Sequence, residues 1–273
     1  SVFPNGPINS SGSNTMAVIT VFSIKGGVGK TTIATELAWR WAQVGARSTL
    51  LCDLDPQGGA SFLAGVGTPQ RQRAAAIFQR DGRPRQAIMP GNPATLSLIP
   101  ADPSLRQLPA LLPRLGPRRL QQMTSLLRSD YQRIVLDCPA GISPVSEQAL
   151  LAADVIIVPL PPSPLSLRAF DQLREELLRL YHRHAPILPV LSMYNNRRLL
   201  HREVRTGYAA AWPAIPLAMQ IEQIAVRRAP ITSFAADSLP DRALGRLWLA
   251  IETRLARCSP PSPPFTPRQA ALA

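Results

Sequence analysis

The sequence predicts an α/β fold with a single doubly wound, mostly parallel sheet that carries helices on both faces. Short apolar runs alternate with amphipathic stretches from residue 17 onward, and this alternation is typical of repeated strand–helix units. Polar motifs directly follow three of the apolar runs. Because the carboxyl ends of parallel strands meet at one edge of a sheet, we expect these motifs to form one ligand site.

The first strand–helix unit contains a glycine-rich loop. An apolar run over 17–24 leads into K-G-G-V-G-K-T-T, and an amphipathic stretch over 30–44 follows it. Glycine lets backbone N–H groups surround a polyphosphate, and a helix N-terminus adds partial positive charge there. Lys30 is expected to reach the β- and γ-phosphates, and Thr31 to ligate Mg²⁺. The expected cofactor-binding residues are Gly26, Gly27, Val28, Gly29, Lys30, Thr31 and Thr32.

The use of lysine supports this interpretation. Lysine occurs only at positions 25 and 30, and every other basic residue apart from three histidines is arginine. A compact, flexible ammonium group suits a phosphate contact. The alternative is a glycine-rich turn with incidental basic residues, and the flanking strand and helix patterns argue against it.

Two further apolar runs end in aspartate. The run over 47–53 continues into Asp53-Leu-Asp55-Pro-Gln57, and the run over 131–137 ends in Asp137. A strand that ends in aspartate is the arrangement in which a carboxylate holds Mg²⁺ in phosphoryl-transfer enzymes. Asp137 is therefore an expected metal ligand. The alternative for the first pair is an ordinary acidic turn after a strand.

These three motifs resemble those of the ParA/MinD family of deviant Walker-A ATPases, and the resemblance covers roughly residues 16–257. It implies ATP and Mg²⁺ as cofactors and a slow, partner-stimulated hydrolysis. In that family the equivalent of Lys25 reaches across an ATP-sandwiched dimer. The equivalent of Asp55 positions the attacking water, and that of Asp53 lies near the Mg²⁺ shell.

The chain departs from the family pattern at two places. The family commonly has Asp-x-Pro-Pro at its third motif, whereas this chain has Asp-Cys-Pro-Ala-Gly over 137–141. Many members end a later strand with an asparagine that recognises adenine. Alignment by the paired arginines places Met193 at that point, so Asn195, or else Asn196, is expected to substitute.

The remaining elements complete the predicted α/β alternation. Further strands are expected over 95–99, 153–159, 187–191 and 214–217, and helices over 170–180 and 244–255. The stretch 105–127 is helical in pattern, but Pro109, Pro113 and Pro117 must kink or split it. Residues 65–93 show only a weak helix, over 74–79.

The ends of the chain are expected to lie outside the fold. Residues 1–15 are polar and turn-rich, which indicates a vector-derived leader, and residues 258–273 form a proline-rich, flexible tail. The ATPase domain is expected over 16–257. No apolar run is long enough to span a membrane, and no signal peptide is visible.

The cysteines and histidines argue against other classes of site. Cysteines at 52, 138 and 258 have neither metal-ligand spacing nor an even pairing, which favours a reducing cytoplasm. Histidines at 182, 184 and 201 match neither a zinc motif nor a Ser-His-Asp arrangement. His201 is expected on a helix surface.

The charge balance indicates an anionic partner. The formal net charge is +13, which favours nucleic acid or an anionic membrane surface. Part of the excess has a simpler explanation, an arginine bias from genomic base composition. The arginines expected to bind DNA are Arg197, Arg198, Arg202, Arg227 and Arg228, in a cluster that also includes Arg205, Arg242 and Arg246.

The resemblance implies one of two biological roles. The first is an ATP-driven homodimer that positions a DNA or protein cargo, uses nonspecific DNA as its track and answers to an activating adaptor protein. The alternative is a regulatory subunit on a membrane-associated assembly, such as cellulose synthase or flagellar machinery, without DNA binding. A proline-rich end in place of the amphipathic helix of MinD-like members favours the nucleoid over the membrane.

Overall fold

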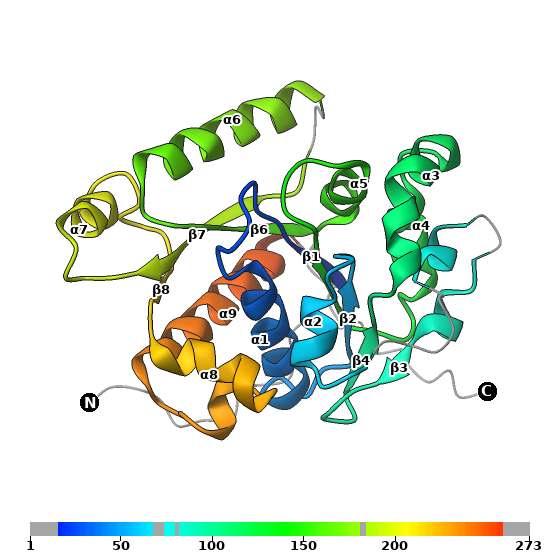
Figure 1. Ribbon diagram of the computed structural model, residues 1–273, viewed down its shortest axis with the longest axis horizontal. Helices are drawn as coiled ribbons and strands as arrows, with labels where there is room; N and C mark the ends of the chain where they lie inside the picture. Colours follow the sequence, from blue (N-terminus) through cyan, green and yellow to red (C-terminus); the bar gives the residue numbers. More distant parts are fainter. Residues whose placement is uncertain (1–15, 68–73, 80–81, 181–183, 259–273) are drawn as a thin grey trace, which may run out of the picture.

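The computed structural model describes residues 16–67, 74–79, 82–180 and 184–258. An eight-stranded sheet forms its centre, with strand order β3-β4-β2-β5-β1-β6-β7-β8 (Figure 1). Among the described strands only the β3–β4 pair is antiparallel. The strands are β1 (Ala17–Val21), β2 (Thr49–Asp53), β3 (Met89–Pro90), β4 (Leu96–Ile99), β5 (Arg133–Asp137), β6 (Val155–Leu160), β7 (Ile187–Tyr194) and β8 (Ala214–Pro216). The predicted mostly parallel α/β sheet is confirmed.

Helices cover both faces of this sheet (Figure 1). The α-helices are α1 (Lys30–Gln43), α2 (Gly59–Leu63), α3 (Leu108–Leu115), α4 (Arg119–Leu126), α5 (Pro144–Ala152), α6 (Pro164–Leu180), α7 (Leu199–Thr206), α8 (Met219–Arg227) and α9 (Leu239–Cys258). Helices α1, α2, α8 and α9 contribute to one hydrophobic core, and α3, α4, α5 and α6 to the other. Alternate strand residues divide between the two cores: Val18 faces one and Ile19 the other, because successive side chains of a strand point to opposite faces.

The strand register brings the three predicted motifs together. Asp137 at the end of β5 lies level with Asp53 at the end of β2 and with Val21 at the end of β1. The glycine loop follows β1 directly. The site therefore forms at the carboxyl edge in the middle of the sheet, where parallel α/β folds bind their ligands.

The structure refines several predicted elements. The stretch 105–127 divides at Gly116–Pro117 into α3 and α4, while Pro109 lies in the first turn of α3 and Pro113 inside it. Strand β7 extends to Tyr194, beyond the predicted 187–191. The weak helix of 74–79 is a short 3₁₀ turn, Ala75–Phe78. Helices α2, α5 and α8 and strand β3 were not predicted.

One predicted position is wrong. His201 lies at the start of α7, where it was expected on the surface, yet the residue is only 6% exposed. Its Nδ1 accepts a hydrogen bond of 3.0 Å from the backbone N–H of Asn195. Burial, with the nearby Arg198, lowers the pKa of His201, which keeps the ring neutral as that acceptor role requires. The predicted leader (1–15) and the tail after 258 lie outside the described residues.

Candidate nucleotide-binding site

The glycine loop has the shape of an anion cradle. Gly27 and Gly29 have φ values of 72° and 81°, a region that glycine enters without steric cost. A Cβ atom added at Gly26 or Gly27 would meet no described atom within 4 Å, so this side of the loop is open. Helix α1 begins at Lys30 with neither a side-chain cap nor an acidic residue in its first turn among the described residues. Its N-terminal N–H groups are therefore available to an anionic ligand.

Residues from strand β7 and from the loop after β5 hold the cradle in place. Ser192 of β7 donates a hydrogen bond of 2.7 Å to the carbonyl of Val28, and a Cβ on Gly29 would come within 3.2 Å of the Ser192 hydroxyl. On the other side, the N–H of Gly141 donates to the carbonyl of Ser23 at 2.9 Å. Sequence reasoning did not identify Ser192, because no local motif marks a serine that contacts a loop more than 160 residues away.

Lys30 and Asp137 form a buried ion pair at the base of the cradle. Lys30 Nζ lies 2.8 Å from Asp137 Oδ1 and 3.3 Å from the Thr31 hydroxyl. Burial raises the pKa of the Asp137 carboxyl, and the Lys30 ammonium opposes that rise. Burial by itself lowers the pKa of Lys30. The Asp137 carboxylate raises the same pKa by more, so the net shift is upward. At the base of the cradle, each group of the pair thus favours the charged form of the other.

The second oxygen of Asp137 fits a magnesium ligand. Asp137 is fully buried, and its Oδ2 has no hydrogen-bond partner among the described residues. A buried carboxylate oxygen without a partner is costly and calls for a donor or a cation. In the described residues no group of three or more His, Cys, Asp or Glu side chains could hold a metal alone. Mg²⁺ is commonly held by one or two protein oxygens together with phosphate oxygens and water. Thr31 and Asp137 are the residues that fit.

Asp53 organises the loop after β2. Its Oδ2 accepts hydrogen bonds from the N–H (2.8 Å) and hydroxyl (2.7 Å) of Ser61, and its Oδ1 accepts from the N–H of Asp55 at 3.3 Å. Burial, with the charge of Asp137, raises the pKa of Asp53 to about 7. Both oxygens thus serve the protein itself in this structure. The metal role of Asp53 stays a prediction.

Asp55 and Lys25 lie at the rim of the site. Asp55 is half-buried, and its charge acts to raise the pKa of both Lys30 and Asp137, which places it near the ion pair. Its Oδ1 accepts the N–H of Gln57 at 3.0 Å. Lys25 is exposed, so its ammonium is accessible to a second molecule.

A largely apolar pocket adjoins the cradle. Thr32 of α1 lines it together with Met193 at the end of β7 and Leu217 after β8. Met193 has a left-handed backbone (φ 56°). Asn195 does not line this pocket: its side-chain oxygen accepts the N–H of Arg197 at 2.9 Å. The pocket has the position and the apolar lining suited to a nucleobase beside the phosphates. Asn195 as an adenine contact stays a prediction that this placement does not favour.

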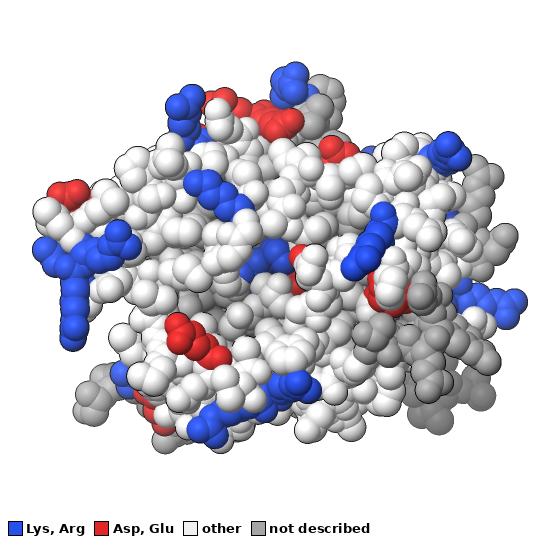
Figure 2. All heavy atoms as spheres, viewed as in Figure 1, with Lys and Arg blue, Asp and Glu red and all other residues white. Residues whose placement is uncertain are grey.

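The predicted DNA-binding arginines fall into two groups. Arg197, Arg198 and Arg202 are exposed at the start of α7, and Arg227 and Arg228 are exposed at the end of α8. Figure 2 shows basic side chains gathered over α7 and over α8 on the same face as the opening of the site. Arg228 lies 4.1 Å from the ring centroid of Phe62, and Arg227 lies 4.9 Å from that of Phe234.

Comparisons with known proteins agree with this geometry. The sequence profile of a family described as an AAA domain matches residues 16–190. The chromosome partitioning protein ParA of Caulobacter vibrioides is 31% identical over 201 residues, which cover 70% of this chain and 75% of the relative. The chromosome-partitioning ATPase Soj of Thermus thermophilus is 31% identical over 243 residues, 85% of this chain and 93% of the relative.

Solved structures show the same fold. Cyanothece McdA in complex with ATP superposes with a TM-score of 0.73 at 20% identity, over 86% of this chain and 97% of that one. The septum site-determining protein MinD of Pyrococcus horikoshii, complexed with Mg-ADP, gives 0.70 at 21% identity, over 86% and 96%. In the part of the chain that the structure describes, no helix has the length and apolar character needed to cross a bilayer. On the profile match and the two curated relatives, the chain belongs to the ParA/MinD family of P-loop ATPases.

Proposed function

We propose that this protein is an ATP-driven switch that hydrolyses ATP slowly as a homodimer and positions a DNA or protein cargo along nonspecific DNA. The observation that carries the proposal is the buried Lys30–Asp137 pair, with a partnerless Asp137 oxygen, at the base of an open glycine loop. This is the charge arrangement that phosphoryl transfer requires, since the reaction needs positioning and neutralisation of phosphate charge.

Each residue has a separable part in the reaction. The loop N–H groups and Lys30 would bind the phosphates, and Thr31 and Asp137 would hold Mg²⁺, which neutralises charge on the phosphate oxygens. Asp55, held by the N–H of Gln57, would orient the water that attacks the terminal phosphorus. That attack forms the new P–O bond as the bond to the ADP oxygen breaks. Lys25, which is exposed, would act on the nucleotide of the second copy.

The basic surface supports DNA as the track. Two exposed arginine groups lie on the face that holds the site, and arginine contacts to phosphate give sequence-independent, salt-sensitive binding. One observation favours the second candidate, a subunit that docks on a membrane-associated assembly: Leu199 and Leu200 are 61% and 38% exposed beside the arginines of α7. Exposed apolar side chains among basic ones also suit a surface that binds another protein.

A mobility shift with random duplex DNA across a salt series tests the proposal. The wild type with ATP and Mg²⁺ is expected to bind as a dimer, and binding should fade as salt rises. Asp55→Ala should stay bound to DNA, because it binds ATP but hydrolyses it slowly, whereas Lys25→Ala should remain monomeric by light scattering and fail to bind.

Surface variants separate the two candidate functions. Changing Arg227 and Arg228 together to Glu should weaken DNA binding by about tenfold or more, while Arg179→Glu, an exposed residue of α6, serves as the matched control. An ATP-bound dimer that does not bind DNA at low salt would contradict the DNA track and favour the docking subunit.

A further inference from the structure

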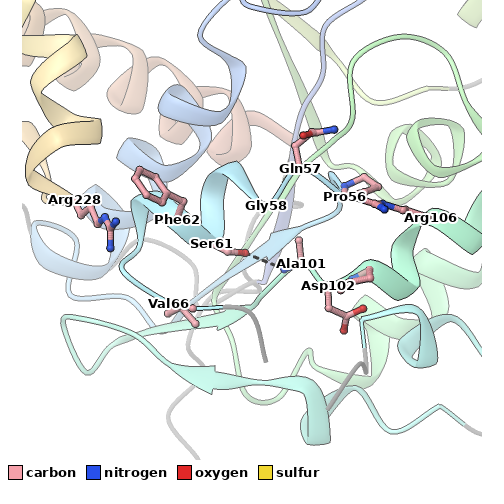
Figure 3. Close-up of a pocket in the computed structure, with 12 residues that line it drawn as sticks. Pro56, Gln57, Gly58, Ser61, Phe62, Val66, Ala101, Asp102, Arg106 and Arg228 are labelled. Atoms are coloured by element: carbon pink, nitrogen blue, oxygen red, sulfur yellow. Dashed lines mark hydrogen bonds between the residues drawn. The ribbon is translucent and has the colours of Figure 1, made fainter. Parts of the chain in front are cut away.

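A second hollow lies next to the loop that carries Asp55. It has a volume of about 520 Å³, and we call it the switch pocket, after the loop that carries Asp55. The lining comes from Pro56, Gln57 and Gly58 of that loop, from Phe62 of α2, and from the segment after β4 that carries Asp102 and Arg106 (Figure 3). Arg228, at the end of α8, closes the side next to Phe62.

Two residues that line the switch pocket donate hydrogen bonds to Asp55. The N–H of Gln57 donates to Asp55 Oδ1 at 3.0 Å, and the N–H of Gly58 donates to the Asp55 carbonyl at 2.9 Å. Deeper in, the Ser61 hydroxyl accepts the N–H of Ala101 at 2.9 Å and donates to Asp53. Residues that line the pocket thus hold both acidic residues of the second motif. A displacement of Gln57 or Gly58 would break these hydrogen bonds to Asp55, the residue expected to orient the attacking water.

The switch pocket is positively charged. Arg106 and Arg228 are exposed and lie on opposite sides of it (Figure 3). Asp102 is the acidic residue of the lining, but it is 3% exposed and accepts the N–H groups of Ala74 and Ser104, each at 2.8 Å. Its charge is therefore turned into the protein, while the two guanidinium groups face solvent. Charge complementarity calls for an anionic occupant.

The switch pocket also offers an apolar surface. Phe62 is 47% exposed, and Val66, Pro56 and Pro103 extend the apolar lining. The Arg228 guanidinium lies over the Phe62 ring at 4.1 Å, so this face of the ring is occupied and cannot stack on a nucleobase. A concave site of this size takes side chains, whereas duplex DNA meets a protein through protruding contacts to its phosphates.

We propose that the switch pocket is the docking site for an acidic segment of the activating protein, one that places an apolar side chain against Phe62 and carboxylates near Arg106 and Arg228. This inference rests on the proposed function, because it names the chemistry of the partner that stimulates hydrolysis. Binding at this wall transmits directly to Asp55 through the hydrogen bonds of Gln57 and Gly58. The partner thereby acts on the water-positioning residue without entering the nucleotide cradle.

A displayed library of random dodecapeptides, selected on the ATP-bound protein, tests the inference. Enriched peptides are expected to carry net negative charge and at least one large apolar residue. A synthetic peptide of the enriched sequence should bind Arg106→Glu about tenfold more weakly than the wild type, and Phe62→Ser should also weaken it. Arg179→Glu is the control and should bind as the wild type does. Arg106 lies outside the predicted DNA-binding set, so this variant separates the two surfaces.

Three results would overturn the inference. The first is enrichment of basic or charge-indifferent peptides, or no enrichment. The second is complete displacement of the peptide by random duplex DNA whose binding also depends on Arg106, which would make the pocket part of a nucleic-acid surface. The third is a peptide that binds the pocket without changing phosphate release. If the wild type itself releases no phosphate from ATP, the proposed function fails, and peptide selection still shows whether the pocket binds acidic segments.

Discussion

Strand β5 carries a charged residue at each end, and the two ends of the strand are used in opposite ways. At the amino end, Arg133 binds Glu252 of α9 through Nε at 2.9 Å and Nη2 at 3.0 Å. The same carboxylate accepts from Trp41 at 2.7 Å and from Arg47 at 3.1 Å. At the carboxyl end, Asp137 holds Lys30 through one oxygen, and its other oxygen has no partner among the described residues.

This difference distinguishes a charged pair that stabilises the fold from a charged pair that can bind a ligand. At the amino end, the Glu252 carboxylate accepts four hydrogen bonds from other side chains of the protein. This cluster therefore fastens α9 and α1 to the sheet and does not bind a ligand. The carboxyl-end pair is more deeply buried, since the Asp137 side chain is 0% exposed and that of Glu252 is 22% exposed. It is nevertheless incompletely satisfied, and it faces an open loop. A buried ion pair alone contributes little to stability once desolvation is counted. What distinguishes the ligand site is the unsatisfied oxygen beside space for a ligand.

The largest expected effect comes from removing the cation at the carboxyl end. Lys30→Ala should lower ATP affinity by about a hundredfold or more, because charge-assisted hydrogen bonds to phosphate are lost and Asp137 is left buried without its ammonium. Titration with a fluorescent ATP analogue and Mg²⁺ measures this, with Asp55→Ala as the control that should bind normally. An unchanged ATP affinity in Lys30→Ala would contradict the assignment of the carboxyl end of β5 as the nucleotide site.

An effect of comparable size, but on stability and not on ligand binding, is expected at the amino end. Glu252→Gln removes the charge that compensates the Arg133 guanidinium, whose side chain is 5% exposed. The free energy of unfolding should fall by about 3 kcal/mol, whereas ATP affinity should change by less than about twofold. Urea denaturation without nucleotide measures the first quantity.

The control for this prediction is a carboxylate with no buried partner. Glu175→Gln changes an exposed acid of α6 and should alter the free energy of unfolding by less than about 0.5 kcal/mol. A large loss of ATP affinity in Glu252→Gln would show that the amino-end cluster also shapes the ligand site.

The sequence predicts one end of β5 far better than the other. The glycine loop, Lys30 and Asp137 follow from local rules, because each is defined by a strand end and the next few residues. The pairing of Arg133 with Glu252 joins residues 119 positions apart, and no local pattern indicates it. Ser192 and His201 were missed for the same reason: their roles depend on loops that only the folded chain brings to them.

Asp53 shows the limit of a motif. Its position at the end of β2 was predicted correctly, but the sequence could not show that both its oxygens accept hydrogen bonds from Ser61 and Asp55. The switch pocket could not be predicted from the sequence either, since its lining comes from α2, the segment after β4 and the end of α8, which are far apart along the chain. Motifs predict which residues reach the edge of the sheet, while tertiary contacts decide which of them remain available.

The smallest expected effect concerns a third carboxylate, which tests whether an unsatisfied oxygen is by itself enough to mark a ligand site. Glu36 of α1 is fully buried, its Oε1 accepts the N–H of Ile231 at 2.8 Å, and its Oε2 has no partner among the described residues. Among the described residues, Arg40 and Asp241 are the charged groups that act on it. Burial, against the opposing effects of Ile231 and Arg40, raises the pKa of Glu36 to about 7.

Glu36 should therefore titrate rather than bind a ligand. Because its pKa rises on folding from 4.5 to about 7, its contribution to stability is fully present below the unfolded value and is lost as pH rises through the folded value. Between about pH 5 and about pH 8 the wild type should lose about 2 kcal/mol of unfolding free energy relative to Glu36→Gln, with ATP affinity unchanged. Urea denaturation of both proteins across this range measures the difference. Parallel profiles would mean that Arg40 keeps Glu36 ionised throughout, and the unsatisfied oxygen would then need the same explanation as that of Asp137, a cation or a ligand.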